Sequence, residues 1–100
     1  LRRLGGSPSL AAFQALQGQV FALHRGGAGR SEVELVAVRS ASRQQPRAEQ
    51  FTLVMRSRQP LAGGSYRVEH PSLGRVPMHL QASGSDAQGA LLRAEFSLLV

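Results

Sequence analysis

The chain has 100 residues, of which 42% are hydrophobic and 5% aromatic, and it contains neither cysteine nor tryptophan. This length predicts a single domain with one modest core, and the lack of cysteine excludes disulfides and thiolate metal sites. Twelve basic residues, all of them arginine, stand against six acidic ones, so the formal net charge is +6. No apolar run approaches the roughly 20 residues that a membrane span needs, and we expect none.

The first residues show no hydrophobic period, so we expect an arm or linker over residues 1–8 and a single β-rich domain over residues 9–100. The segment from residue 7 to residue 18 predicts a short helix, because Ser7 or Ser9 can cap it and Gly18 can end it. Three apolar side chains at helical spacing would form its buried stripe: Leu10, Phe13 and Leu16. A helix this short must dock on the rest of the domain.

The next segment, HRGGAGRS at residues 24–31, raises the question of a phosphate-binding loop. Gly29, Arg30 and Ser31 imitate the end of such a motif, but its first glycine would have to stand where His24 is. The residues that follow alternate as in a strand, whereas a phosphate loop leads into a helix. A hairpin loop between two strands is therefore predicted.

From residue 19 onward apolar and polar residues alternate, which is typical of strands with one buried face. Six segments follow this pattern: residues 19–24, 32–40, 50–57, 65–70, 75–82 and 90–100. No helix separates them, and the connections are rich in Gly, Pro, Ser and Asp, which favours antiparallel pairing. The fold class predicted is mainly β: a small antiparallel barrel or sandwich of about six strands with one short N-terminal helix.

The apolar faces of these strands should share one core with the helix. The members expected from the strands are Phe21, Leu35 or Val36, Phe51, Leu53, Tyr66, Val68, Met78, Leu80 and Phe96. Pro77 lies inside the fifth segment, and proline offers no N–H to a ladder. We therefore expect that strand to be an edge there, or to be bulged.

No catalytic or metal-binding constellation is visible, so we expect a domain that is not an enzyme and has no cofactor or metal. Histidines 24, 70 and 79 do not obviously converge, and no nucleophile is paired with a base. His70 and Pro71, with Gly74, predict a tight turn in which the ring of His70 bonds to the backbone. Two same-face charge pairs, Arg67 with Glu69 and Arg93 with Glu95, are typical of solvated cross-strand charge ladders.

The arginines permit an alternative function, the binding of a polyanion such as nucleic acid. Arg39, Arg43 and Arg47 recur in one stretch and would gather at one end of a hairpin. A second group would gather at the opposite end: Arg25, Arg30, Arg56 and Arg58. Two separated clusters, with the aromatic residues on core faces, favour nucleic-acid binding less than a protein partner or self-association.

The chain closes on an apolar strand rather than a polar tail, and two interpretations are open. The strand is either covered on both faces, by the helix among others, or its outer side or edge meets another subunit. In the second case the possible subunit interface comprises Phe96, Leu98, Leu99 and Val100.

The stretch GSYRVEHPSLG at residues 64–74 shows the pattern Gly-x-Tyr-x-Leu-x-His-Pro-x-Leu-Gly, with Val68 in the Leu position. Together with Gly18, Phe21 and Phe96 it resembles a bacterial family of small domains of unknown function over residues 9–100. Members of that family are compact β-rich domains often encoded near proteins like phage-tail collars. The resemblance implies a non-catalytic structural or assembly module, made in the cytoplasm and incorporated into a phage-tail-like or surface fibre assembly. The compartment itself stays open.

Overall fold

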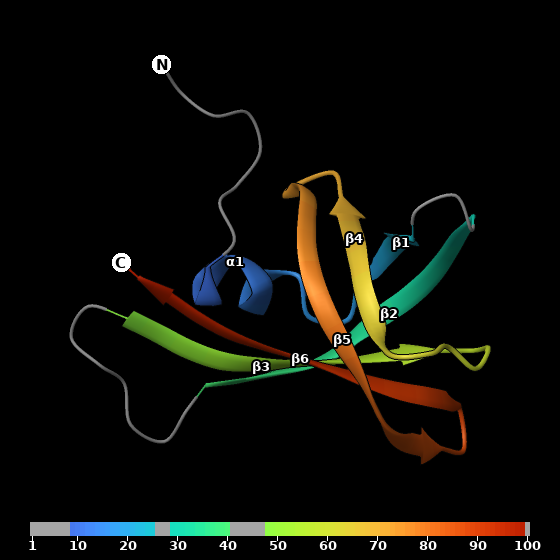
Figure 1. The fold of residues 1–100 in the computed structure, drawn as a ribbon. Helices are drawn as coiled ribbons and strands as arrows, with labels where there is room; N and C mark the ends of the chain where they lie inside the picture. Colours follow the sequence, from blue (N-terminus) through green and yellow to red (C-terminus); the bar gives the residue numbers. More distant parts are fainter. Residues whose placement is uncertain (1–8, 26–28, 41–47, 100) are drawn as a thin grey trace.

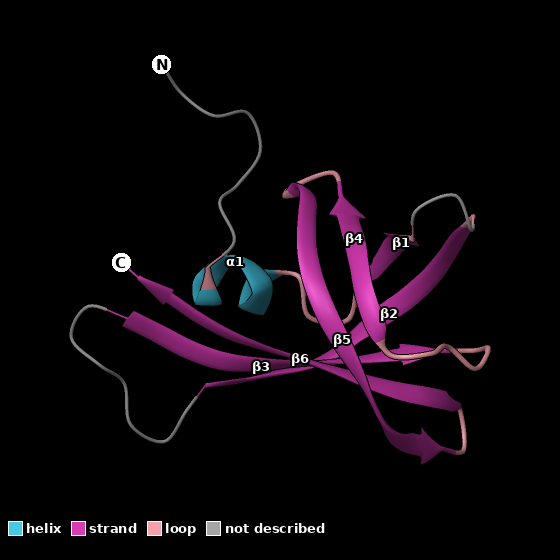
Figure 2. Cartoon of the chain, viewed as in Figure 1, coloured by secondary structure: helices cyan, strands magenta, loops and turns pink. Residues whose placement is uncertain are grey.

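The computed structural model describes residues 9–25, 29–40 and 48–99, with the backbone alone for residues 48, 49, 98 and 99. One helix and six strands follow one another: α1 (Leu10–Ala15), β1 (Val20–His24), β2 (Arg30–Ser40), β3 (Ala48–Ser57), β4 (Gly64–His70), β5 (Gly74–Asp86) and β6 (Gly89–Leu99). The strands form a closed antiparallel barrel in the order β1-β2-β3-β6-β5-β4 (Figure 1 and Figure 2). The predicted fold class is confirmed, as a barrel rather than a sandwich.

The helix is short because both of its ends are fixed locally. Ser9 is the N-cap, and its Oγ accepts a hydrogen bond of 3.1 Å from Ala12 N–H. The helix ends before Leu16, and Gly18 then takes a positive φ of 90° that side chains rarely adopt. Gly18 N–H donates to Leu35 O at 2.7 Å, so the chain leaves the helix directly onto the edge of β2.

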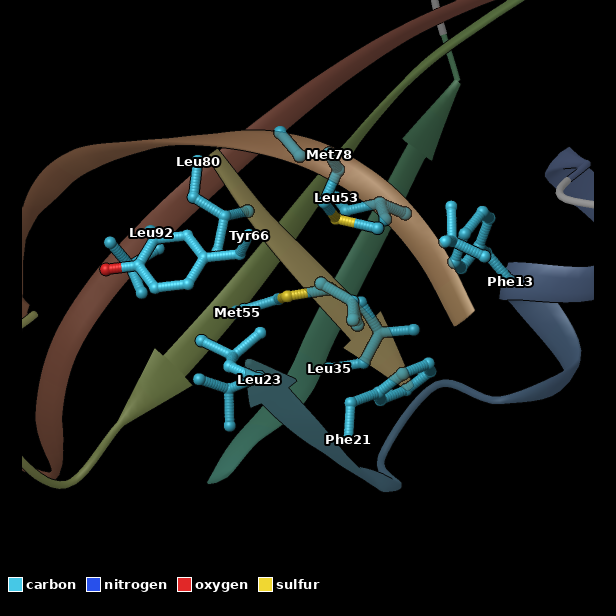
Figure 3. Close-up of a cluster of buried hydrophobic side chains, with 14 of the residues drawn as sticks. Phe13, Phe21, Leu23, Leu35, Leu53, Met55, Tyr66, Met78, Leu80 and Leu92 are labelled. Atoms are coloured by element: carbon cyan, nitrogen blue, oxygen red, sulfur yellow. The ribbon is translucent and has the colours of Figure 1, made fainter. Parts of the chain in front are cut away.

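One hydrophobic cluster fills the barrel, as the alternation predicts (Figure 3). All expected members except Leu10 and Phe96 are buried in this cluster, with Leu35 rather than Val36 as the member from the second strand. Leu10 and Phe96 are partly exposed and pack against it.

Leu35 shares the inner face with Val33 by plain alternation. A bulge follows it, since the register of β2 on β3 shifts between Leu35 and Ala37, and Val38 rather than Ala37 then packs against the core. Gln17 provides an acceptor for the backbone of this irregular segment, because its Oε1 accepts a hydrogen bond of 3.3 Å from Val38 N–H.

The last hairpin differs from its prediction. The polar stretch at residues 83–89 does not form the long loop that its composition predicts, because β5 continues to Asp86 and β6 begins at Gly89. A register shift between Ala82 and Ser85, with Gly84 at φ +114°, lets the ladder continue through this stretch. A side chain at Gly89 would collide with the backbone oxygen of Ser57, so glycine is required where the hairpin crosses β3.

Candidate functional site

The barrel is closed by hydrogen bonds along only half of the seam between β5 and β6. Residues 74–80 of β5 pair with β4, and residues 81–86 pair with β6 as far as Arg93. Beyond Arg93, β6 continues to Leu99 as a partner of β3 alone among the described residues. Its opposite edge, over residues 94–99, therefore carries backbone groups with no ladder partner on β5.

The two strand edges that border this open seam are not equivalent. Pro77 lies in the part of β5 that pairs with β4 only, so the predicted edge position of this proline is confirmed. Proline blocks the addition of another strand there, because it has no N–H and hinders a neighbour. The free part of β6 contains neither proline nor glycine, so it keeps every backbone donor.

Helix α1 covers the inner side of the open seam. It packs on β2 and β3, beside the end of the long β3–β6 pair that is furthest from the β5–β6 hairpin (Figure 1). Phe13 enters the core from this helix (Figure 3), with ring centroids 5.8 Å from Phe51 and 5.5 Å from Phe96. Phe51 and Phe96 are themselves stacked at 5.1 Å. Three aromatic rings thus close the core where the ladder does not.

A groove of about 860 Å³ extends over the β3–β6 pair and the end of β2. Its wall includes charged, hydroxyl and aromatic groups: Arg39, Thr52, Arg93, Glu95, Phe96 and Ser97. Arg93 is engaged with Glu95 at 3.6 Å, the pair that the alternation predicts, and donates to Gln81 Oε1 at 3.2 Å. The groove therefore borders the free edge of β6 and carries nearly balanced charge, with Arg39 as its unpaired cation among the described residues.

A second groove, of about 1070 Å³, lies over β1, β2 and the end of β3. Val20 is 55% exposed at its wall, and Arg30 and Arg58 also line it. The cation at its centre, Arg56, is 17% exposed and donates to Glu34 at 3.4 Å and to both carboxylate oxygens of Asp86. The hydrogen bond from Arg56 holds the pKa of the Asp86 carboxyl below its ordinary value.

The predicted arginine clusters are brought together only in part: Arg30, Arg56 and Arg58 of the second group line one groove, and the others lie elsewhere or outside the described residues. Arg43 and Arg47 lie outside the described residues, and Arg39 belongs to the first groove, apart from Arg30 and Arg58 in the second. Arg25 instead lies over the ring of Tyr66, with its Cζ 5.4 Å from the ring centroid. The described part of the chain therefore presents no continuous basic track.

Two histidines make specific contacts that tie strands together. His70 is 7% exposed; its Nδ1 accepts a hydrogen bond of 3.0 Å from Ser72 N–H, the ring-to-backbone contact expected in this turn. Its Nε2 then carries the proton and donates to Gln19 Oε1 at 2.8 Å. His24 Nε2 lies 2.8 Å from Glu69 Oε1. No group of three or more potential metal ligands gathers among the described residues.

Glu69 belongs to a cross-strand charge ladder, as predicted, although its ion pairs are made with neighbouring strands and not with Arg67, its same-face neighbour on β4. Its carboxylate contacts His24 of β1 and, at 3.5 Å, Arg75 of β5. Arg75 stands directly opposite Glu69 in the β4–β5 register, which brings the two side chains closer than neighbours along one strand. The hydrogen bond from His24, with Arg75 nearby, lowers the pKa of Glu69.

The last strand does not fit the interpretation that both of its faces are covered. Helix α1 meets only its inner face, through Phe96, whereas Glu95 and Ser97 on the outer face are exposed. Of the predicted interface, Phe96 is half-buried at the free edge. Leu98 and Leu99 belong to β6 with only their backbone described, and Val100 lies outside the described residues.

A family model described as "Domain of unknown function (DUF6916)" matches residues 8–96, which is most of the chain. The chain belongs to this family. No curated protein and no solved structure shows significant similarity to this DUF6916 domain. Among its described residues, no helix has the length and the apolar character needed to cross a bilayer.

The open edge of this DUF6916 domain is the feature that sequence reasoning found only in part. Pro77 indicated an edge in β5, but nothing in the local pattern showed that β6 loses the same ladder from Ala94 onward. No local signal could have found it, because it depends on the length of β5 and on where β5 changes from β4 to β6.

Proposed function

We propose that this domain is a non-catalytic assembly module that joins proteins through the surface around the free edge of β6. The observation that carries the proposal is the open seam, where residues 94–99 of β6 pair with β3 alone among the described residues, while α1 seals the core beneath them. An unpaired strand edge is a ready template for another strand. Keeping the core sealed lets the edge stay available without exposing the apolar interior.

The resemblance at residues 64–74 gives this proposal a biological setting. Relatives with the same pattern are bacterial and are often encoded near proteins like phage-tail collars. On this basis the module is made in the cytoplasm and becomes part of a phage-tail-like or surface fibre assembly.

The test compares the domain in its native host with an edge variant. A tagged wild-type chain should sediment with a high-mass particle in host lysate, and Ser97→Glu, which places a charge beside the free edge, should shift it to the top of the gradient. Ser65→Glu is the matched control, because Ser65 is an exposed serine on β4, where the strand is paired. A wild-type chain that always sediments as a free monomer contradicts the proposal.

Polyanion binding is the second candidate, favoured by three exposed arginines. Arg39, Arg58 and Arg67 form no ion pair with any described residue. They lie on separate parts of the surface, and both grooves also contain carboxylates. A gel-shift series with nucleic acid decides between the two functions. Polyanion binding would appear at low salt and weaken steeply as salt rises. Association between proteins of this charge would not be strengthened by low salt.

A further inference from the structure

We infer that the strand received by the free edge of β6 is β6 of a second copy of the chain. Resting on the proposed function, the inference names its partner: two β6 strands pair antiparallel about a two-fold axis that passes beside Phe96. The β3–β6 pair of one barrel would then continue as a four-stranded layer into the β6–β3 pair of the other. A contact of this kind is isologous and closes as a dimer.

The edge is suited to this pairing by what it lacks. Soluble proteins protect open edges with proline, charged side chains that point inward, bulges or a covering element. On β5, Pro77 provides such protection, whereas residues 94–99 of β6 form an unbroken register with β3. Helix α1 packs on β2 and β3, so its backbone leaves the edge of β6 uncovered.

Charge and face select the register. Residues directly opposite in an antiparallel pair share a face, so Glu95 and Ser97, both exposed on the outer face, can oppose only outer residues of the second copy. With the axis beside Phe96, Glu95 faces Ser97 of the second copy, and the two Phe96 side chains meet on the inner face. The Glu95–Ser97 contact occurs twice by symmetry, and no like charges are opposed.

Neighbouring registers are worse. With the axis beside Glu95, the two Glu95 carboxylates would oppose each other, which is unfavourable. That register would also use Arg93, whose backbone is already paired with Gln81 of β5. With the axis beside Ser97, Glu95 would be directly opposite Leu99 rather than a polar residue. Of the three, the register beside Phe96 lies within the free edge and places Glu95 directly opposite a polar residue, with the two Glu95 residues only diagonal to each other.

Cross-linking tests this register directly, because the chain has no cysteine of its own. Opposite residues place their Cβ atoms about 4.5–5.5 Å apart and diagonal ones about 7–8 Å, while a disulfide needs about 3.5–4.5 Å. A mixture of the Glu95→Cys and Ser97→Cys proteins should therefore form a disulfide-linked heterodimer under mild oxidation. Either protein alone should cross-link far less. Preferential linkage of two Ser97→Cys chains to each other, or equal linkage in all three samples, overturns the register.

Sedimentation equilibrium of cysteine-free proteins gives an independent measurement. Ser97→Glu would oppose Glu95 twice and should raise the dimer dissociation constant about two- to thirty-fold, while Ser97→Lys should lower it by a similar factor. Ser65→Glu makes the same charge change away from the edge and should leave the dissociation constant near that of the wild type. Equal effects of Ser65→Glu and Ser97→Glu would mean that net charge controls association, and they overturn the inference.

The failure of this inference can be distinguished from the failure of the proposed function. A purified wild-type chain that stays monomeric at millimolar concentration overturns pairing between two copies. If the same chain still sediments with a high-mass particle in host lysate, the assembly role stands and a different protein occupies the edge.

Higher salt should strengthen the dimer, because each copy carries a net charge of +6 and salt screens their repulsion.

Discussion

Phe13→Ala removes the side chain that seals the core where the β5–β6 ladder is missing. Phe13 is 0% exposed, and its ring contacts both members of the stacked Phe51–Phe96 pair. Truncation would leave a cavity between α1 and the inner face of β3 and β6. The same change would also weaken the docking of α1, whose other buried side chain is Leu16, just beyond its last residue.

Truncating a buried phenylalanine lowers the free energy of unfolding by about 3–5 kcal/mol, and more where the surroundings cannot move into the cavity. Here the surroundings can move in part, because α1 has only six residues and Phe13 is its only buried one. We therefore expect a loss near the lower limit, about 3 kcal/mol. Since a domain has a total stability of about 5–15 kcal/mol, this loss should lower the melting temperature by more than about 10 °C.

Urea unfolding followed by far-UV circular dichroism measures this effect, because the chain has no tryptophan to serve as a fluorescence probe. Gln14→Ala is the control: Gln14 is exposed on the same helix, and the change should alter the free energy of unfolding by less than about 0.5 kcal/mol. If Phe13→Ala unfolds within about 1 kcal/mol of the wild type, well short of the loss expected for a buried ring, α1 does not seal the seam.

Three further predictions concern the contacts that close the barrel. His70→Ala removes the hydrogen bonds of both ring nitrogens and should destabilise the domain by about 2–4 kcal/mol. His70→Asn should restore part of this stability, because its amide oxygen can accept the bond that Nδ1 accepts. Equal losses of stability in the two variants would contradict this. Gly89→Ala should be far more harmful in thermal melts than Gly84→Ala, because both have positive φ but only the first meets the backbone of β3. The pKa of Asp86 is lowered by its partner, so its stabilising effect is complete above the ordinary pKa of 3.8 and is lost as pH falls through the lower folded value. Asp86→Asn should therefore be less stable than the wild type at neutral pH and equal to it in strong acid; a pH-independent difference in urea midpoints would contradict the ion pair.

The sequence predicted the elements that depend on neighbours along the chain. Ser9 and Gly18 fixed the limits of the helix through their own backbone preferences, and alternation assigned Phe21, Leu53 and Val68 to the buried face. These features follow from local geometry. A hydrophobic residue two positions from another in a strand must share its face, whatever the strand pairs with.

Features that depend on register could not be predicted in this way. The partner of Glu69 is Arg75 rather than Arg67 because the HPSLG turn sets the β4–β5 alignment. The bulge after Leu35 decides that Val38, rather than Ala37, packs against the core. His24 reaches Glu69 across a distance of 45 residues in the chain. Alternation does not determine which of several polar side chains will lie opposite one another, since every register that keeps the faces satisfies the same pattern.

The open edge itself follows from the lengths of the strands. β5 has 13 residues and divides them between β4 and β6, while β3 and β6 stay paired over nearly their whole length. Because β5 changes from β4 to β6 half-way along its length, part of β6 has no strand on that side. The twist of the sheet then separates this part of β6 from β5. An apolar side chain such as Phe13 can fill the resulting gap, but it cannot bond the backbone groups of residues 94–99 that point away from β3. Those groups need either water or another strand, so the device that lets α1 complete the core also leaves β6 ready for a partner.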